Sequence, residues 1–344
     1  MRAVIERLWW RAAPPPWPLQ ALEVLYSAVA DRIARRRKAT AVRLPVPVIV
    51  VGNVAVGGTG KTPVTLALIE QLRALGATPG VLSRGYGGRG PFPLMVSSAT
   101  VAAHCGDEPL LIVQRAQVPL CVAPSRAEAG RVLLAAHPEV DVLLCDDGLQ
   151  HYALARDLEI GVIDGARGHG NGHRLPAGPL REMPSRLDDC GLVLVNGAEP
   201  EGFGERALRF DLQADEAIEL RTGERRALAA FVGASVEAVA GIGHPQRFFD
   251  LLQRHGLQVQ AHAFADHHEF TAADLSLAGH AAIFMTEKDA VKCGALPLPT
   301  TRAYWYVPVT AGMSQAVQGR VQECLRSVLT THRSATRPQP RAKP

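Results

Sequence analysis

The sequence lacks long apolar runs, paired cysteines and a strong charge of either sign. No stretch of 18 uncharged apolar residues is present, so we expect no transmembrane helix. The six cysteines are scattered without a CxxC pair, which predicts reduced thiols in a cytosolic protein and neither a disulfide framework nor a metal site. The net charge is only +4, and no basic stripe carries aromatic residues, so nucleic acid is not an expected partner.

The chain does contain the material for a large core. Its 344 residues are 47% hydrophobic and 20% charged, as in ordinary globular proteins, and this length suits two domains. No internal repeat is apparent. No feature of the sequence indicates an obligate protein partner.

The first 38 residues differ from the rest. Three of the four tryptophans lie in the first 17 residues, and the cations at 35–38 follow a stretch with helical spacing. The apolar residues that this spacing places on one face are Leu19, Leu22, Leu25, Tyr26, Val29 and Ile33. Such a helix favours an anionic membrane surface, and the alternative is a helix packed on its own domain. A cleaved signal peptide fits poorly, because Glu23 and Asp31 interrupt the apolar run.

Strands alternating with helices dominate residues 39–205. Apolar runs typical of buried parallel strands lie at 45–53, 78–88, 118–124, 140–148, 158–165 and 190–197. A helical pattern follows the first run at 63–75, and another ends at residue 136. We therefore predict an α/β fold with a doubly wound, mainly parallel sheet, whose binding site lies at the carboxyl ends of the strands.

The pattern changes after about residue 205. Residues 206–228 are polar and alternating, which predicts a hairpin or linker between domains. Strand and helix patterns then restart, so we expect a second, smaller α/β domain over 229–328. The proline- and arginine-containing tail at 329–344 is expected to be disordered.

The stretch 51–63, VGNVAVGGTGKTP, predicts a phosphate loop (P-loop). Such a loop needs glycines where backbone amides close around oxygens, a lysine for the β- and γ-phosphates and a hydroxyl for magnesium. The candidate nucleotide-binding residues are Ala55, Val56, Gly57, Gly58, Thr59, Gly60, Lys61 and Thr62. The loop departs from the pattern GxxxxGK[ST] at Ala55, where the first glycine would stand.

A magnesium-dependent nucleotide site also needs a carboxylate at the end of a neighbouring strand. Asp146 and Asp147 end the apolar run at 140–148. Because adjacent residues of a strand face opposite ways, only one is expected to face the metal unless the chain turns there. Asp146 is the favoured ligand, and Asp147 is the alternative.

Transfer of a phosphoryl group to a hydroxyl needs a group that takes the proton. The candidates in loops at strand ends are Asp107, Glu108, His151, Glu182, Asp266, His267 and His268. Arg84 and Arg181 are candidate anion clamps.

Eight blocks occur in an order that resembles one known family. They are GNVAVGGTGKTP, SRGYGG, GDEP, CDDGLQH, LPAGPLRE, GIGHPQRFF, FADHHEFT and TEKDAVK, within residues 19–310. The sequence resembles the tetraacyldisaccharide 4′-kinases, the lipid A 4′-kinases of the Gram-negative inner membrane. Their phosphate loop also lacks the first glycine, so the resemblance makes Ala55 a family trait.

The resemblance implies a P-loop NTPase-like kinase core over 39–205 and an N-terminal membrane-associated segment over 1–38. It implies ATP- and Mg²⁺-dependent transfer of the γ-phosphate to the 4′-hydroxyl of tetraacyldisaccharide 1-phosphate, a lipid, in lipid A biosynthesis. Because that acceptor stays in the bilayer, the enzyme is expected to act at the cytoplasmic face of the inner membrane, with its N-terminal helix on the membrane surface.

The resemblance also distributes roles among the site residues. It implies that Asp107 and His267 act together as base and orienting partner, in an order left open. Lys61 is expected to bind phosphate. Magnesium contacts are expected among Thr62, Asp146, Asp147 and Glu182, and contacts to substrate or phosphate at Arg84, His151 and Arg181.

Three other interpretations stay open. A deviant P-loop regulatory or partitioning ATPase at the membrane would hydrolyse ATP without an acceptor, but that class carries a lysine at the position of Val56. A nucleotide-dependent membrane adaptor would use the N-terminal helix as its functional end. A GTPase would need an NKxD motif, and Asn196 stands without the lysine or the aspartate.

Overall fold

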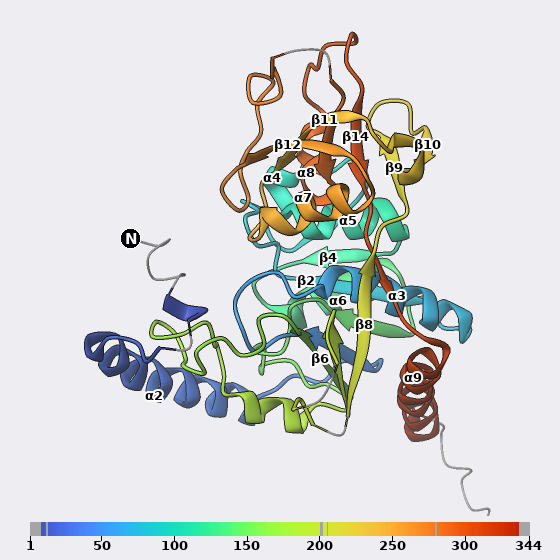
Figure 1. Ribbon diagram of the computed structural model, residues 1–344. Coiled ribbons are helices and arrows are strands. Elements are labelled where there is room, and N and C mark those ends of the chain that lie inside the picture. The colour runs from blue at the N-terminus through green and yellow to red at the C-terminus, as the bar shows by residue number, and fades with distance from the viewer. Residues whose placement is uncertain (1–7, 12, 200–201, 205, 279–280, 337–344) are drawn as a thin grey trace, which may run out of the picture.

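Two β-sheets organise the molecule (Figure 1). The computed structural model describes residues 8–11, 13–199, 202–204, 206–278 and 281–336. A nine-stranded sheet forms the lower part of Figure 1, and a six-stranded sheet forms the upper part. The predicted fold class, a large and mainly parallel α/β sheet with a second smaller one, is confirmed.

The large sheet has the strand order β15-β8-β7-β6-β1-β5-β2-β4-β3. Its strands are β1 (Val48–Gly52), β2 (Pro79–Ser83), β3 (Leu94–Val96), β4 (Leu120–Val122), β5 (Val142–Cys145), β6 (Leu158–Asp164), β7 (Leu192–Asn196), β8 (Ala207–Gln213) and β15 (Thr310–Gly312). The six strands predicted from apolar runs are β1, β2 and β4 to β7, and they pair in parallel. The edge strands β3 and β15 are antiparallel to their neighbours.

Helices cover both faces of the large sheet, as in a doubly wound fold. One face carries α3 (Lys61–Ala74), α5 (Asp107–Ala116) and α9 (Gln315–Thr336), and the other carries α6 (Arg126–Ala136). Alternate residues of β1 serve the two layers, because Ile49 and Val51 pack in the first and Val48 and Val50 in the second. The short helix α4 (Ala102–Cys105) precedes α5, and the 3₁₀-helix η1 (Pro184–Asp189) precedes β7.

The small sheet has the order β10-β9-β14-β13-β11-β12. Its strands are β9 (Glu216–Glu219), β10 (Arg225–Ala227), β11 (Ser235–Ala240), β12 (Gln258–Ala263), β13 (Ile283–Thr286) and β14 (Tyr304–Val307). The helices α7 (Pro245–Arg254) and α8 (Glu287–Cys293) lie on opposite faces, with the 3₁₀-helix η2 (Leu228–Phe231) beside α7.

The chain crosses between the sheets twice, and this divides it differently from the predicted segments. The expected linker at 206–228 is shared between the sheets, because β8 pairs with β7 whereas β9 pairs with β10 and β14. A second crossing follows β14, and β15 returns to pair with β8. A polar, alternating stretch is typical of both a linker and an edge strand, so pairing alone decides between them.

The C-terminal helix α9 belongs to the large sheet. Its Val317, Val321, Leu325 and Leu329 repeat every fourth residue and are buried in the core beneath that sheet. The expected disorder of 329–344 is therefore wrong as far as Thr336, where α9 ends, and the remainder lies outside the described residues.

The predicted N-terminal helix is α2 (Trp17–Ala39), which lies apart from both sheets in Figure 1. None of its residues is buried. On the apolar side of the helix, the exposed fractions range from 44% to 62% at Leu22, Leu25, Val29 and Ile33. No helix in the described part of the chain is long and apolar enough to cross a membrane.

Candidate active site

The glycine-rich loop between β1 and α3 has the backbone of a phosphate cradle. Gly57 has φ of 108° and Gly60 has φ of 97°, which L side chains rarely adopt. A Cβ atom on Gly60 would also lie 3.1 Å from the ring of Phe210. The loop leads into the first turn of α3, whose free amides and dipole favour an anion.

The structure explains why residue 55 need not be glycine. Ala55 forms a bridge with Leu180, so the first half of the loop is extended. Hydrogen bonds join its neighbours to the same segment, from Val56 N to the Pro179 carbonyl at 2.9 Å and from Arg181 N to the Val54 carbonyl at 2.6 Å. Ala55 is not among the residues with positive φ, and its methyl group is buried.

Buried polar groups around the loop fit a phosphate ligand. The side chains of Asn53 and Thr59 are 1% and 5% exposed, yet their polar atoms have no hydrogen-bond partner among the residues that the structure describes. Buried polar groups are rarely left unpaired, so such atoms mark a place where a polar ligand binds. Lys61, whose ammonium lies 3.7 Å from Asp147, supplies the positive charge.

The two adjacent aspartates meet the head of α3 in different environments. Asp146 is buried and accepts a hydrogen bond from the Thr65 hydroxyl at 2.9 Å. Asp147 has φ of 46°, so the chain turns there, and its carboxylate lies 3.2 Å from Arg181. The sequence predicted that only one aspartate faces the metal unless the chain turns there. The chain does turn at Asp147, and this turn brings the Asp147 carboxylate close to Lys61.

Their pKa values move in opposite directions. Burial, with the nearby carboxylates of Glu108 and Asp147, raises the pKa of Asp146 to about 7. Burial also opposes ionisation of Asp147, but Lys61 and Arg181 outweigh it and lower its pKa to about 2. Asp147 is therefore ionised at neutral pH, whereas a bound cation would favour the ionised form of Asp146.

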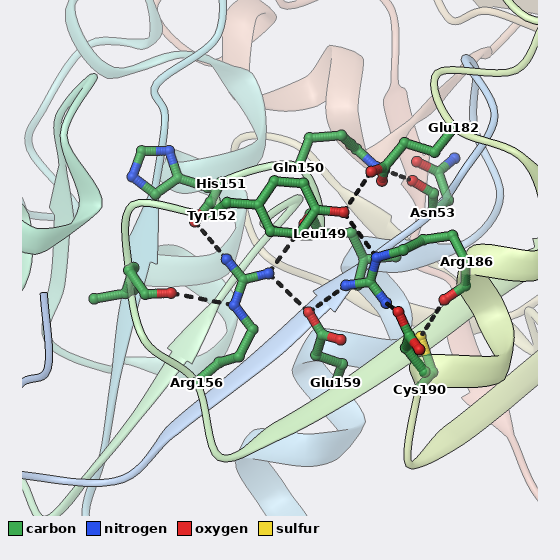
Figure 2. A network of polar contacts seen from close by, with 12 residues as sticks. Asn53, Leu149, Gln150, His151, Tyr152, Arg156, Glu159, Glu182, Arg186 and Cys190 are labelled. Atoms are coloured by element: carbon green, nitrogen blue, oxygen red, sulfur yellow. Dashed lines mark hydrogen bonds and ion pairs between the residues drawn. The ribbon is translucent and has the colours of Figure 1, made fainter. Parts of the chain in front are cut away.

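Glu182 lies in a neighbouring polar network (Figure 2). Its carboxylate accepts hydrogen bonds from Gln150 Nε2 at 2.8 Å and from the Tyr152 hydroxyl, and Tyr152 in turn accepts one from Arg186 at 2.8 Å. Within the described residues, no three or more His, Cys, Asp or Glu side chains form a group that would hold a metal. The predicted metal set is thus not gathered around one point.

A smaller donor set nevertheless fits magnesium. Mg²⁺ in nucleotide sites keeps water and phosphate ligands and takes only one or two carboxylates. The Thr62 hydroxyl at the head of α3 and the carboxylates of Asp146 and Asp147 match that chemistry, and the raised pKa of Asp146 marks a carboxylate short of positive charge.

Asp107 and His267 come together although 160 positions separate them. Asp107 begins α5, and His267 follows β12 in the small-sheet part of the chain. His267 Nδ1 lies 3.1 Å from Asp107 Oδ2, and His267 has φ of 61°. Burial opposes ionisation of Asp107, but the hydrogen bond with His267 and the charges of Lys292 and Lys288 outweigh it and lower its pKa.

Charged pairs between α5 and α8 align the two parts of the molecule. Lys288 Nζ lies 3.1 Å from Glu108, and Arg115 Nη1 lies 2.7 Å from Glu287. A cleft of about 1040 Å³ opens beside these helices and reaches Asp107 and His267. Lys288 and Lys292 were not predicted as site residues, although TEKDAVK contains both.

The predicted anion clamps cluster only in part. Arg181 contacts Asp147 and Gln150, whereas Arg84 is exposed at the end of β2. His151 Nε2 accepts the backbone N–H of Arg126 at 3.2 Å, and burial together with arginine charges, Arg126 first, lowers the pKa of His151 to about 4.

Sequence reasoning missed Arg126. It is 2% exposed at the start of α6, and in the described part of the chain its Nε has no hydrogen-bond partner. The only signal was its place directly after a buried strand, in the stretch CVAPSR.

Comparison with known proteins decides the family. The family model described as Tetraacyldisaccharide-1-P 4′-kinase matches residues 15–327. The chain belongs to the tetraacyldisaccharide 4′-kinase family. It is similar to the tetraacyldisaccharide 4′-kinase of Pseudomonas putida W619, with 48% identity over 96% of this chain and 99% of that protein. It is also similar to that of Pseudomonas aeruginosa LESB58, with 49% identity over 90% of this chain and 92% of that protein.

The fold agrees with a solved member of this kinase family. The LpxK of Aquifex aeolicus, crystallised in complex with ATP, aligns with a TM-score of 0.75 and 24% identity over 90% of this chain and 98% of that one. The tetraacyldisaccharide 4′-kinase family was thus identified correctly from the ordered sequence blocks.

Proposed function

We propose that this chain transfers the γ-phosphate of ATP to the 4′-hydroxyl of tetraacyldisaccharide 1-phosphate. Its membership of the tetraacyldisaccharide 4′-kinase family supports this reaction. The observation that carries this proposal is the contact of Asp107 with His267. A kinase needs an oriented group that takes the proton of the acceptor hydroxyl. An ATPase that acts as a switch has no acceptor hydroxyl and does not need such a pair assembled from two domains.

The phosphate loop holds the donor. Backbone amides at Gly57 to Lys61 surround the phosphate oxygens, and the Lys61 ammonium balances charge that develops during transfer. Mg²⁺, held by Thr62, Asp146 and Asp147, would neutralise charge on the β- and γ-phosphates. We assign Glu182 to support of the loop, through Gln150 and Tyr152.

Asp107 and His267 take the proton of the acceptor hydroxyl. In one arrangement the Asp107 carboxylate is the base and His267 orients it; in the other, Asp107 holds Nδ1–H and Nε2 is the base. His267 Nε2 lies 3.5 Å from Lys288 Nζ and 3.9 Å from Asp266 Oδ1. Because the pair joins two domains, it is complete only when the domains are together, which limits access of water to the γ-phosphate.

The cationic and hydrogen-bonding side chains near the strand ends suit a phosphorylated sugar. Arg181, the neutral His151 and the exposed Arg84 were expected there, and the buried Arg126 adds a fixed guanidinium. We assign these groups to the acceptor and to transferred phosphate.

The helix α2 brings the site to the membrane. Its polar side is fixed to the loop after β6, where Glu23 lies 2.8 Å from His173 Nδ1 and Asp31 lies 2.9 Å from Arg174. Its apolar side remains open and forms a shallow groove with Pro176. We propose that this side, followed by the cations at 35–38, lies on an anionic leaflet at the cytoplasmic face of the inner membrane.

The reaction is tested with γ-labelled ATP and tetraacylated disaccharide 1-phosphate in mixed micelles. We expect labelled lipid from the unchanged protein and a loss of about 100-fold or more with Asp107→Ala. ATP consumption without lipid is measured in parallel, and Asp188→Ala, an exposed aspartate with the same change of charge, serves as control. Equal ATP turnover with and without lipid, and no labelled lipid, would leave the partitioning ATPase as the better interpretation.

Membrane attachment is tested by sedimentation with vesicles of phosphatidylglycerol and phosphatidylethanolamine. Leu25→Glu should weaken binding about 10-fold or more, because a buried leucine contributes about 1.5 to 3 kcal/mol. The matched control is Val232→Glu, which changes a residue that is 66% exposed in the small-sheet part. The proposal for α2 fails if both variants bind like the unchanged protein.

A further inference from the structure

Lys292 connects the second domain to Asp107. Its ammonium lies 3.7 Å from Asp107 Oδ2 and 2.9 Å from Asp289 Oδ1. The Lys292 side chain is 8% exposed and that of Asp289 is not exposed at all, so both charges are removed from water. A buried lysine is costly unless its partners compensate for lost hydration, and here both partners are carboxylates.

Asp289 is fixed by the loop that precedes α7. Its Oδ2 accepts the Gly241 N–H at 2.9 Å and the Thr286 hydroxyl at 2.6 Å. A Cβ atom on residue 241 would lie 3.1 Å from Asp289 Oδ1, so glycine permits this approach. The carboxylate therefore ties Lys292 to the backbone at Gly241.

The same glycine holds His267. Its carbonyl accepts the His267 N–H at 3.1 Å, which supports the left-handed backbone of that residue. These contacts form a closed ring. Asp107 contacts His267, and the His267 N–H donates to the Gly241 carbonyl. The Gly241 N–H donates to Asp289, which pairs with Lys292, and Lys292 lies beside Asp107. Displacement of any member would change the approach of Asp107 to His267.

We propose that Lys292 is a positioning residue. Its ammonium holds the Asp107 carboxylate ionised and in line with His267, and the pair of Lys292 with Asp289 fixes the loop that carries His267. This role rests on the proposed kinase reaction, in which Asp107 and His267 take the acceptor proton. Lys288 differs in that it contacts Glu108 and the far nitrogen of His267.

The charged environment of Asp107 comes from every element packed against it. The titratable groups that act on it are Cys105 on α4, His267 in the loop, and Lys288 and Lys292 on α8. Glu108, Asp266 and Asp289 lie against these partners, since Glu108 and Asp266 act on Lys288 and Asp289 pairs with Lys292. The two lysines and the histidine favour the ionised carboxylate. Removal of one ammonium therefore raises the pKa of Asp107 and moves the acid limb of the kcat profile to higher pH.

The test measures kcat, both KM values and the pH dependence of kcat with lipid acceptor. Lys292→Met should lower kcat about 100-fold, the loss expected for a misplaced catalytic group, with little change in either KM. Lys292→Arg, which keeps the charge, should recover part of kcat. Because Lys292→Met leaves Asp289 buried without its partner, the double variant Lys292→Met, Asp289→Asn is measured beside it and should fold while retaining the defect.

A double-mutant cycle separates positioning from general support. In an Asp107→Asn background, Lys292→Met should cost almost nothing further, because both of its effects act through the pair of Asp107 with His267, which that background already disrupts. An equal loss in both backgrounds, an unshifted pH profile, or a raised KM for ATP at constant kcat would each overturn the proposal. No labelling of lipid by the unchanged protein would instead refute the kinase reaction itself, so the two failures are distinguishable.

Discussion

The phosphate-binding half of the site and the proton-accepting half are built in contrasting ways. The first is a continuous stretch between β1 and α3, with positive φ at Gly57 and Gly60. The second joins Asp107 on α5 to His267 in a loop of the other domain. Short-range backbone geometry therefore shapes the donor site, whereas packing between domains shapes the acid–base pair.

This difference separates two kinds of vulnerability. A change in the loop alters local backbone energy and does not depend on contacts between the two sheets. A change at the α5–α8 contact leaves the loop intact and alters only the alignment of groups that take the proton. The first two predictions below distinguish these kinds, and the third concerns a histidine near the phosphate loop.

The largest effect is expected from Gly60→Ala. At φ of 97° and with Phe210 at 3.1 Å from the added methyl group, the loop must deform. We expect a stability loss of about 1 to 3 kcal/mol and a fall in kcat/KM for ATP of about 100-fold. Thermal melting without ATP and steady-state kinetics measure the two effects.

Gly58→Ala is the matched control for the melting experiment, because Gly58 does not have a positive φ and, apart from its chain neighbours, nothing in the described residues lies within 4 Å of an added Cβ. It should melt like the unchanged protein. Equal destabilisation by both substitutions would contradict the argument from backbone geometry.

An intermediate effect is expected from Arg115→Met, which removes the contact between α5 and Glu287 on α8. Because the phosphate loop is untouched, kcat should fall about 10-fold while KM for ATP stays nearly constant. Arg89→Met is the control, since its pair with Glu269 also joins the domains but is 78% and 81% exposed and contributes little. A rise in KM for ATP, or an equal loss in the control, would count against alignment by α5 and α8.

The smallest effect concerns His151 and pH. Its pKa is about 4 in the folded protein against an ordinary 6.5, so the unfolded chain binds more protons between these values. Stability is therefore lost as pH falls from about 6.5 toward 4, and His151→Gln should reduce the drop in melting temperature between pH 7.5 and pH 5.

His104→Gln, at an exposed position, serves as control for the pH experiment and should melt like the unchanged protein at both pH values. If His151→Gln shows the full acid-induced drop, His151 does not resist protonation in the folded state.

Much of the large sheet could be predicted because its signals are local. β-branched runs indicated the six parallel strands, and GGTGKT between a strand and a helix indicated the phosphate loop. The edge strand β15 and its neighbour β8 were not placed in the large sheet, because each is defined by its partner and carries a weak pattern of its own. The C-terminal helix α9 was not predicted, because its first residues were assigned to the second domain and its last ones to a disordered tail.

The site was predicted only in part, because its residues also come from distant parts of the chain. Asp107 and His267 were named through resemblance to a family, and their contact is present in the structure. Arg126 and Lys292 were not named, because a lone cation in a sequence does not reveal whether it is buried. Glu182 was grouped with the magnesium ligands, which stays a prediction, and the structure adds its hydrogen bonds with Gln150 and Tyr152.

The sequence by itself determined the parallel strands, the phosphate loop and the family, because strand burial and glycine-rich turns depend on neighbouring residues. Tertiary structure decided that Asp147 turns toward Lys61, that β15 and α9 return to the large sheet, and that Lys292 lies beside Asp107. These outcomes depend on distances and dielectric environment between residues far apart in the chain, and a linear pattern contains neither quantity.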